Sequence, residues 1–265
     1  MTRFTAPENK VENNDRSTTV IARQPPTMRE PLEIENLSVR LDGFSLEEIS
    51  FRLHPGQVTG LLGHNGAGKT TTLRLIMGMV RKDTGSIRIG SLDHQKDEKA
   101  FKRRIGFVPE ESYFYNRMTT GELIDFVKGF HQSWNEETCT HLLDILDLRA
   151  EKRIGQLSKG IRMKVNLLLA LAYEPDVLLL DEATAGLDPR SRIEILKLVR
   201  AAAHEHGRAV LFSTHILHEV EQIADRIIIL DHGRVLSDEN LNRLRNKEQN
   251  SGSWSLEKYY LELIS

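Results

Sequence analysis

The spacing of apolar and polar residues predicts a chain that opens with strands. Residues 32–39 alternate apolar and polar side chains, and residues 46–51 do so more loosely, as expected of strands with one buried face. Short apolar runs that also predict strands lie at 58–62, 86–89 and 105–108. We expect this opening to be antiparallel in part, beside a parallel core.

The middle of the chain carries helix signals. Thr119 and Glu122 have the spacing of a capping box, in which each side chain accepts a hydrogen bond from the other residue's backbone. A second helix is expected from about Glu136 to Leu146. We therefore expect residues 112–165 to form a helical subdomain inserted into an α/β fold.

The second half returns to strands that alternate with helices. Residues 177–180 are continuously apolar, which is typical of a strand buried on both faces of a parallel sheet. Asp188-Pro189 and the later Gly207 bracket a predicted helix of about 18 residues. Further strands are predicted at 209–212 and 227–230. The pattern as a whole predicts an α/β fold with a mostly parallel core sheet, an N-terminal antiparallel β subdomain and the helical insert.

Three segments follow from these patterns. Residues 1–30 contain prolines and many polar side chains without apolar periodicity, which predicts a disordered extension. Residues 31–236 carry the α/β pattern. Residues 237–265 are expected to form a small C-terminal helical tail.

Composition narrows the class of protein. The 265 residues carry a formal net charge of -2, so we expect no broad basic face and no nucleic-acid partner. The one cysteine, Cys139, excludes an intramolecular disulfide and fits a reducing, cytoplasmic compartment. The nearest approach to a membrane span, residues 167–180, is interrupted at 174–176, short of the roughly 20 apolar residues needed. We expect a protein that is soluble by itself, which leaves a peripheral place on a membrane complex open.

The strongest chemical motif is a glycine-rich loop between a predicted strand and a predicted helix. Glycines let backbone N–H groups wrap a phosphate chain, and a helix N-terminus adds partial positive charge. Lys69 would neutralise the β- and γ-phosphates, and the Thr70 hydroxyl would bind Mg²⁺. The motif predicts a nucleoside triphosphate site. The residues expected to form it are Gly63, His64, Asn65, Gly66, Ala67, Gly68, Lys69, Thr70 and Thr71.

Two further motifs add groups that phosphoryl transfer needs. The apolar run 178–180 ends in Asp181 and Glu182. We expect Asp181 to hold the Mg²⁺ shell and Glu182 to orient or deprotonate the attacking water. Ser158 precedes a predicted helix and can cap it, which presents a hydroxyl and the positive helix end. Read alone, Ser158 is simply a helix cap.

The set of motifs, in this order, resembles the ATP-binding subunit of ATP-binding cassette (ABC) transporters over residues 32–236. The resemblance implies an ATPase that uses ATP and Mg²⁺ and works as a head-to-tail dimer with a second ATPase subunit. In such a dimer, Ser158, Lys159 and Gly160 of one subunit cover the ATP held by the phosphate loop of the other.

The resemblance assigns further roles by position. Asp188 falls in the loop that crosses the dimer interface. His215 occupies the position of the histidine that contacts the γ-phosphate in this family. The resemblance therefore implies that His215 is a catalytic residue, together with Lys69 and Glu182. Glu110 takes the place of the family's glutamine after a core strand, and an acid there can still contact Mg²⁺ or its water.

Other departures from the family pattern bear on binding and rate. The family's signature motif corresponds to residues 157–161 of this chain. Lys159 replaces the first glycine of that motif, and Ile161 replaces its usual glutamine. The aromatic residue that stacks on adenine aligns near Leu41, and Phe44 is the nearest ring, so Phe44 is the candidate base contact. The nature of the base contact stays open at this point.

These departures, together with the tail at 255–263, resemble the branch of the family that serves small exporters of drugs, peptides or lipids. The resemblance implies an ATPase peripheral on the cytoplasmic face of a membrane, which powers export through a separate integral membrane subunit. That subunit would dock on the helical insert and residues 107–115. Two alternatives are a soluble ABC ATPase that acts on DNA or ribosomes, and a nucleotide switch with little hydrolysis, which Lys159 and Glu110 favour.

Overall fold

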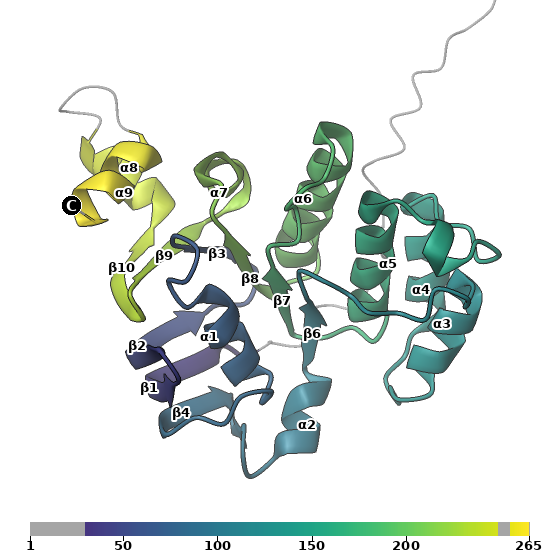
Figure 1. Cartoon of the computed structure of the whole chain (residues 1–265), viewed down its shortest axis with the longest axis horizontal. Coiled ribbons are helices and arrows are strands. Elements are labelled where there is room, and N and C mark those ends of the chain that lie inside the picture. Colours follow the sequence, from purple (N-terminus) through teal and green to yellow (C-terminus); the bar gives the residue numbers. More distant parts are fainter. Residues whose placement is uncertain (1–29, 249–254, 265) are drawn as a thin grey trace, which may run out of the picture.

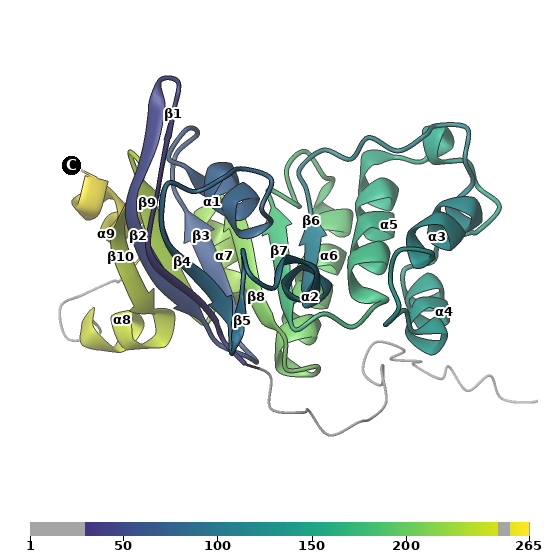
Figure 2. The same ribbon diagram turned by 90° about the horizontal axis from the view of Figure 1, so that it is seen from below.

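A computed structural model describes residues 30–248 and 255–264, which form two β-sheets flanked by helices (Figure 1). The extension expected to be disordered therefore lies outside the described residues, apart from Glu30. In the two perpendicular views of Figures 1 and 2, the helices α3 (Thr120–Lys128), α4 (Glu136–Ile145) and α5 (Lys159–Leu171) stand at one side of the molecule. This side lies away from the strands β1 (Leu32–Leu41) and β2 (Phe44–Leu53) (Figures 1 and 2).

The first sheet is antiparallel, as the alternating pattern predicts, with the strand order β2-β1-β4-β5. Its strands are β1 (Leu32–Leu41), β2 (Phe44–Leu53), β4 (Thr84–Ile89) and β5 (Leu92–Asp93). The alternation breaks between Ile34 and Leu37 because the register shifts there, and Asn36 takes a positive φ of 49°. Such a bulge inserts an extra residue and restores the buried face beyond it.

The second sheet forms the centre of the molecule, with the order β10-β9-β3-β8-β7-β6. It is parallel from β9 to β6, and only the edge strand β10 runs antiparallel, to β9. Its strands are β3 (Val58–Leu62), β6 (Ile105–Val108), β7 (Val177–Asp181), β8 (Ala209–Thr214), β9 (Arg226–Asp231) and β10 (Arg234–Asn240).

The central strands are continuously apolar because both of their faces are buried. In β7, Val177 and Leu179 belong to the core shared with the antiparallel sheet, whereas Leu178 and Leu180 belong to the core under the helices. Successive side chains of a strand point to opposite faces, so an unbroken apolar run serves two cores at once.

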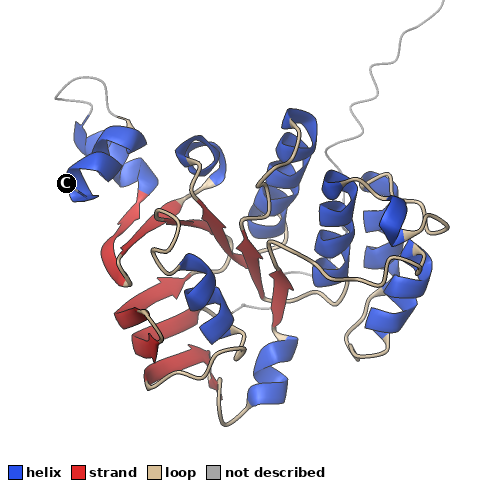
Figure 3. Ribbon diagram, viewed as in Figure 1, coloured by secondary structure: helices blue, strands red, loops and turns tan. Residues whose placement is uncertain are grey.

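Helices lie on several sides of the sheets, with α3, α4 and α5 grouped at one of them (Figures 1 and 3). They are α1 (Lys69–Ile76), α2 (Glu98–Arg103), α3 (Thr120–Lys128), α4 (Glu136–Ile145), the 3-10 turn η1 (Ile154–Gln156), α5 (Lys159–Leu171), α6 (Pro189–His204), α7 (Leu217–Ile223), α8 (Leu241–Glu248) and α9 (Leu256–Ile264). Both hydrogen bonds of the Thr119–Glu122 capping box are present, as the spacing predicts.

Some elements differ from the sequence prediction. Residues 237–240, expected in a helical tail, are the second half of β10. Their polar side chains hide the strand, which is held by pairing with the apolar β9. The predicted helix after Asp188 has 16 residues and ends at His204, short of Gly207. The short elements β5, α2 and α7 carry too little apolar periodicity to be predicted.

Phe212 tests how much the central strands contribute to stability. Its side chain is fully buried in β8, so Phe212→Ala leaves a cavity and lowers the free energy of unfolding by about 3–5 kcal/mol. Phe126→Ala on α3 is the matched control: this ring is 56% exposed, and its loss costs under about 1 kcal/mol. Urea unfolding followed by circular dichroism measures both, and equal costs would contradict the prediction.

Candidate functional site

The glycine-rich loop links β3 to α1 at the centre of the parallel sheet. Gly68 precedes α1 with a φ of 112°, a backbone conformation that favours glycine. At Gly63 a side chain is excluded, because an added Cβ would lie 2.5 Å from the Leu230 carbonyl oxygen. These glycines let the loop curl tightly against the β9–β10 hairpin and close around the end of Lys69.

Lys69 places a buried ammonium group inside this loop. Its Nζ donates to the carbonyl oxygens of Gly63 at 2.8 Å and His64 at 3.3 Å, and lies 3.3 Å from Oε1 of Glu182. The residue is 6% exposed. A buried charge needs such partners, and an ammonium held by oxygens in a glycine loop suits a phosphate oxygen equally well.

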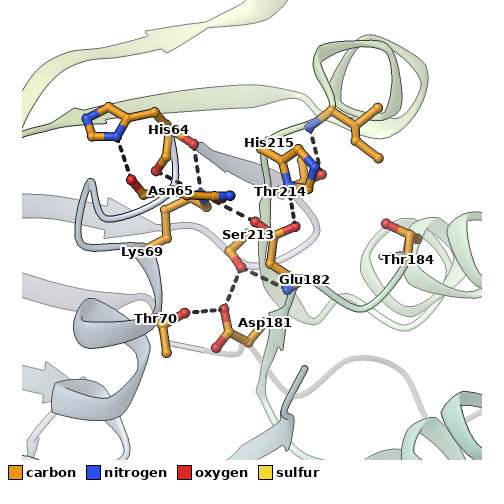
Figure 4. Close-up of polar contacts among 12 residues, drawn as sticks. His64, Asn65, Lys69, Thr70, Asp181, Glu182, Thr184, Ser213, Thr214 and His215 are labelled. Atoms are coloured by element: carbon orange, nitrogen blue, oxygen red, sulfur yellow. Dashed lines mark hydrogen bonds and ion pairs between the residues drawn. The ribbon is translucent and has the colours of Figure 1, made fainter. Parts of the chain in front are cut away.

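Asp181 ends β7 directly beneath the phosphate loop (Figure 4). Its Oδ1 accepts hydrogen bonds from Thr70 Oγ1 at 3.1 Å and from Ser213 Oγ at 2.8 Å. The hydroxyl of Thr70 and the carboxylate of Asp181 therefore lie together as hard oxygen ligands. Adjacent oxygens at this separation suit Mg²⁺ or its bound water.

Glu182 occupies a constrained position between Lys69 and His215. Its backbone has a positive φ of 45°, and its N–H donates to Ser213 Oγ at 3.0 Å. Its carboxylate is held by Lys69 on one oxygen and by His215 Nδ1, at 2.9 Å, on the other. Left-handed backbone in a non-glycine residue persists when the surrounding structure holds it, and functional sites are where it concentrates.

Another buried acid, Glu219 on α7, contacts the residues next to the site and is not part of any of the sequence motifs. Its Oε2 accepts from Thr184 at 2.8 Å and from Thr214 at 3.0 Å, and Oε1 lies 3.3 Å from Arg192 Nε. Glu219 thus joins the turn after Glu182, the end of β8 and α6. Its polar helix gave no signal that this carboxylate is buried.

The signature residues form a separate group at two neighbouring helix N-termini. Ser158 caps α5, and its Oγ accepts from the Ile161 N–H at 3.3 Å. Asp188 caps α6 and accepts a 2.6 Å bond from the Ser191 hydroxyl, which holds the pKa of Asp188 below its usual range. An added Cβ on Gly160 would lie 2.6 Å from the same Ser191 oxygen.

Lys159 belongs to this group as well. Its Nζ lies 3.1 Å from the position of an added Cβ on Gly186, in the loop that leads to Asp188. In the described chain, no hydrogen bond of Ser158, Lys159 or Asp188 reaches the phosphate loop. The structure therefore separates the predicted residues into two groups. The network of Figure 4 contains residues of the phosphate loop together with Asp181, Glu182 and His215, and the signature residues and Asp188 lie at the N-termini of α5 and α6.

The remaining predicted residues lie at the edges of the site. Glu110 is exposed two residues after β6, the strand next to β7, and makes no hydrogen bond to Thr70 or Asp181. Phe44 begins β2, and its ring would contact a Cβ on Gly68 at 3.0 Å. It lines a hollow of about 400 Å³ with Leu41, Gly66 and other residues. The candidate base contact Phe44 and the aligned position Leu41 therefore both lie beside the loop.

Among the residues that the structure describes, helices long and apolar enough to span a membrane are absent.

Comparison with known proteins agrees with this geometry. A family model described as ABC transporter matches residues 46–185. The chain is 37% identical to LnrL of Bacillus subtilis, a linearmycin resistance ATP-binding protein, over 71% of this chain and 62% of LnrL. It is 33% identical to BcrA of Bacillus licheniformis, a bacitracin transport ATP-binding protein, over 77% of this chain and 68% of BcrA. The chain thus spans about three fifths to two thirds of the length of these curated relatives.

A solved structure titled as that of the ATP binding subunit of an ABC transporter superposes on 88% of this chain and 99% of its own, with a TM-score of 0.78 and 29% identity. The fold, the order of the motifs and the family match point to one conclusion. The chain belongs to the family of ABC transporter ATP-binding proteins, whose members hydrolyse ATP.

Proposed function

We propose that this protein binds and hydrolyses ATP to power export through a separate membrane subunit. The observation that carries the proposal is the network at the end of the parallel sheet, in which the buried Lys69 and Glu182 are in contact with each other and Glu182 is also in contact with the exposed His215. The hydroxyl of Ser213 connects Glu182 to the buried Asp181. The names of LnrL and BcrA, which refer to antibiotic resistance and transport, favour export. The cargo would be chosen by the membrane subunit.

The chain's own residues supply positioning and charge. Lys69 and the loop N–H groups would hold the β- and γ-phosphates, and Thr70, Asp181 and Glu110 would hold Mg²⁺ or its water. Bound Mg²⁺ neutralises phosphate charge. Glu182 would orient the attacking water and accept its proton, while His215 holds the carboxylate and reaches toward the γ-phosphate. Phosphoryl transfer depends mainly on such positioning and electrostatic stabilisation.

The Lys69–Glu182 ion pair would hold both side chains in place before ATP binds. Both groups are buried, so each one needs a charged or polar partner at all times. A γ-phosphate bound at Lys69 would replace Glu182 as the partner of the Lys69 ammonium group. The Glu182 carboxylate would then be free to bind the attacking water. The same exchange would leave His215 as the remaining partner of the carboxylate.

The signature group supports a head-to-tail dimer. Ser158, Lys159 and Asp188 are exposed at helix N-termini, with the buried Gly160 next to them. In the described chain, their hydrogen bonds do not reach their own phosphate loop. Helix N-termini attract anions, so this surface suits the phosphates of a nucleotide held by a second chain. We propose a homodimer or a heterodimer with a related chain, in which each ATP lies between two subunits.

Exposed aromatic side chains support docking of a membrane subunit at the helical insert. Tyr113 and Tyr115 precede α3 and are 89% and 77% exposed, and Phe126 and Phe130 are 56% and 68% exposed. The two phenylalanine rings contact each other edge to face. Exposed apolar groups of this kind mark protein-interaction sites, so the protein would be peripheral on the cytoplasmic face of a membrane.

The role of Glu182 is tested by Glu182→Gln. We expect steady-state ATP hydrolysis to fall at least about a hundredfold, because the amide accepts no proton, while binding of ATP is retained. Phosphate release and nucleotide binding measure the two properties separately. Glu205→Gln, an exposed acid at the end of α6, is the control. Near-normal turnover in Glu182→Gln would exclude Glu182 as the base.

The shared site is tested by mixing two inactive chains. Lys69→Ala removes the phosphate contact, and Ser158→Arg blocks the signature surface, so each variant alone should hydrolyse no ATP. A mixed dimer contains one site with an intact Lys69 and an intact Ser158, so mixing should restore part of the wild-type rate. No recovery, although cross-linking shows mixed dimers, would contradict the composite site.

The membrane partner is tested by purification from detergent extracts. An integral membrane protein should co-purify with the wild-type chain and be lost from the double variant Phe126→Ser/Phe130→Ser, with ATP binding unchanged. Recovery of ribosomes or DNA instead would favour a soluble ATPase. Slow single-turnover hydrolysis with the membrane partner present would favour a nucleotide switch.

A further inference from the structure

Three metal-ligating side chains converge where the phosphate loop meets the β9–β10 turn. His64 belongs to the loop, Asp231 ends β9, and His232 follows in the turn. Nε2 of His64 lies 3.0 Å from Asp231 Oδ1, and Nε2 of His232 lies 3.9 Å from Asp231 Oδ2. One ligand atom from each residue lies within 4.8 Å of the others, a clustering of His, Cys, Asp or Glu found here alone among the described residues.

The hydrogen bond on the other nitrogen of His64 fixes the ring's chemistry. Nδ1 lies 2.7 Å from the carbonyl oxygen of Asn65 (Figure 4). A carbonyl only accepts, so the hydrogen of the neutral ring is on Nδ1, and Nε2 turns a lone pair toward the Asp231 carboxylate. That contact is favourable only with a positive charge between the two atoms, either a second ring proton or a metal ion.

A histidine–aspartate pair elsewhere in the chain shows the contrast. Nε2 of His204 lies 2.9 Å from Asp225 Oδ2, but Arg200 Nε donates to its Nδ1 at 3.4 Å. The ring hydrogen of His204 is therefore on Nε2, where it binds the carboxylate without any added cation. His64 has the opposite arrangement, which is typical of metal-ligating histidines: the second ring nitrogen donates to a backbone carbonyl.

We propose that His64, Asp231 and His232 bind Zn²⁺ or a similar divalent transition-metal ion, at a site distinct from that of Mg²⁺. Two imidazoles and one carboxylate are ligands that Zn²⁺ takes in proteins, with further positions left to water. Zinc bonds of about 2.0–2.2 Å place neighbouring ligand atoms roughly 3.3 Å apart. The contacts of 3.0 and 3.9 Å, which run from the two rings to different oxygens of Asp231, lie on either side of this separation.

The proposed ion would tie the phosphate loop to the hairpin beside it. These segments already touch, since the Gly233 N–H donates to the Ala67 carbonyl at 3.1 Å. Within the described chain, the ion-pair partners of Asp231 are the two histidines, so no lysine or arginine competes for this carboxylate. His232 also lines the hollow that contains Phe44, so the ion would lie at the entrance to the nucleotide site.

The test is calorimetric titration of the full-length, tag-free and nucleotide-free chain with Zn²⁺. We expect one equivalent to bind and to raise the melting temperature. His232→Asn and Asp231→Asn should each weaken binding by at least about tenfold, because each removes a ligand. Asparagine tolerates the positive φ of 45° at position 232, so the turn is kept. His204→Asn should leave Zn²⁺ affinity unchanged.

Cobalt substitution provides a second readout that a merely destabilised variant would not alter in the same way. Co²⁺ bound by the wild-type chain should show visible absorption bands of low-coordinate cobalt, and these should vanish in His232→Asn while circular dichroism shows an intact fold. The proposal is overturned if the wild-type chain takes up no Zn²⁺. It is also overturned if His232→Asn and Asp231→Asn bind Zn²⁺ as tightly as wild type does.

Discussion

The parallel register of β3, β8 and β7 is the constraint on which the site depends. Leu62 pairs with Thr214 across β3 and β8, and Asp181 pairs with Ser213 across β7 and β8. The three strands therefore end at one edge, where the phosphate loop, Glu182 and His215 follow them. Because these strands are buried on both faces, a slip of one residue would exchange the two cores and separate the site.

Burial of charge gives this edge its chemistry. Lys69, Asp181 and Glu182 are all buried, yet their positive and negative groups partner one another and nearby hydroxyls. In such surroundings an unpaired charge is costly, so each of these groups requires a charged or hydrogen-bonding partner. Glu219 is a further buried carboxylate whose hydrogen bonds satisfy it. It accepts from Thr184, in the turn after Glu182, and from Thr214, at the end of β8, and so holds both to α7.

Local patterns predicted much of this architecture. The capping box at Thr119, the doubly buried strand at 177–180 and the turn from Asp188 into a helix are set by neighbouring residues, so a single sequence reveals them. The strand at 237–240 and the burial of Glu219 escaped prediction. The polar residues 237–240 are held by pairing with the preceding strand β9, and the Glu219 carboxylate is held by Thr184, 35 positions away in the chain. The apolar pattern of either segment alone records neither partner.

The sequence by itself determined which groups are present and in what order: a glycine loop that can curl, a lysine, a hydroxyl and two acids after a strand. Only the tertiary structure decided which of them meet. Residues more than a hundred positions apart, Thr70 and Asp181, share a hydrogen bond because parallel strands carry them to one edge. The same folding brings His64 to Asp231, whereas the side-chain hydrogen bond of Ser158 stays within its own helix, α5. Spatial proximity arises from strand pairing, which a linear sequence does not display.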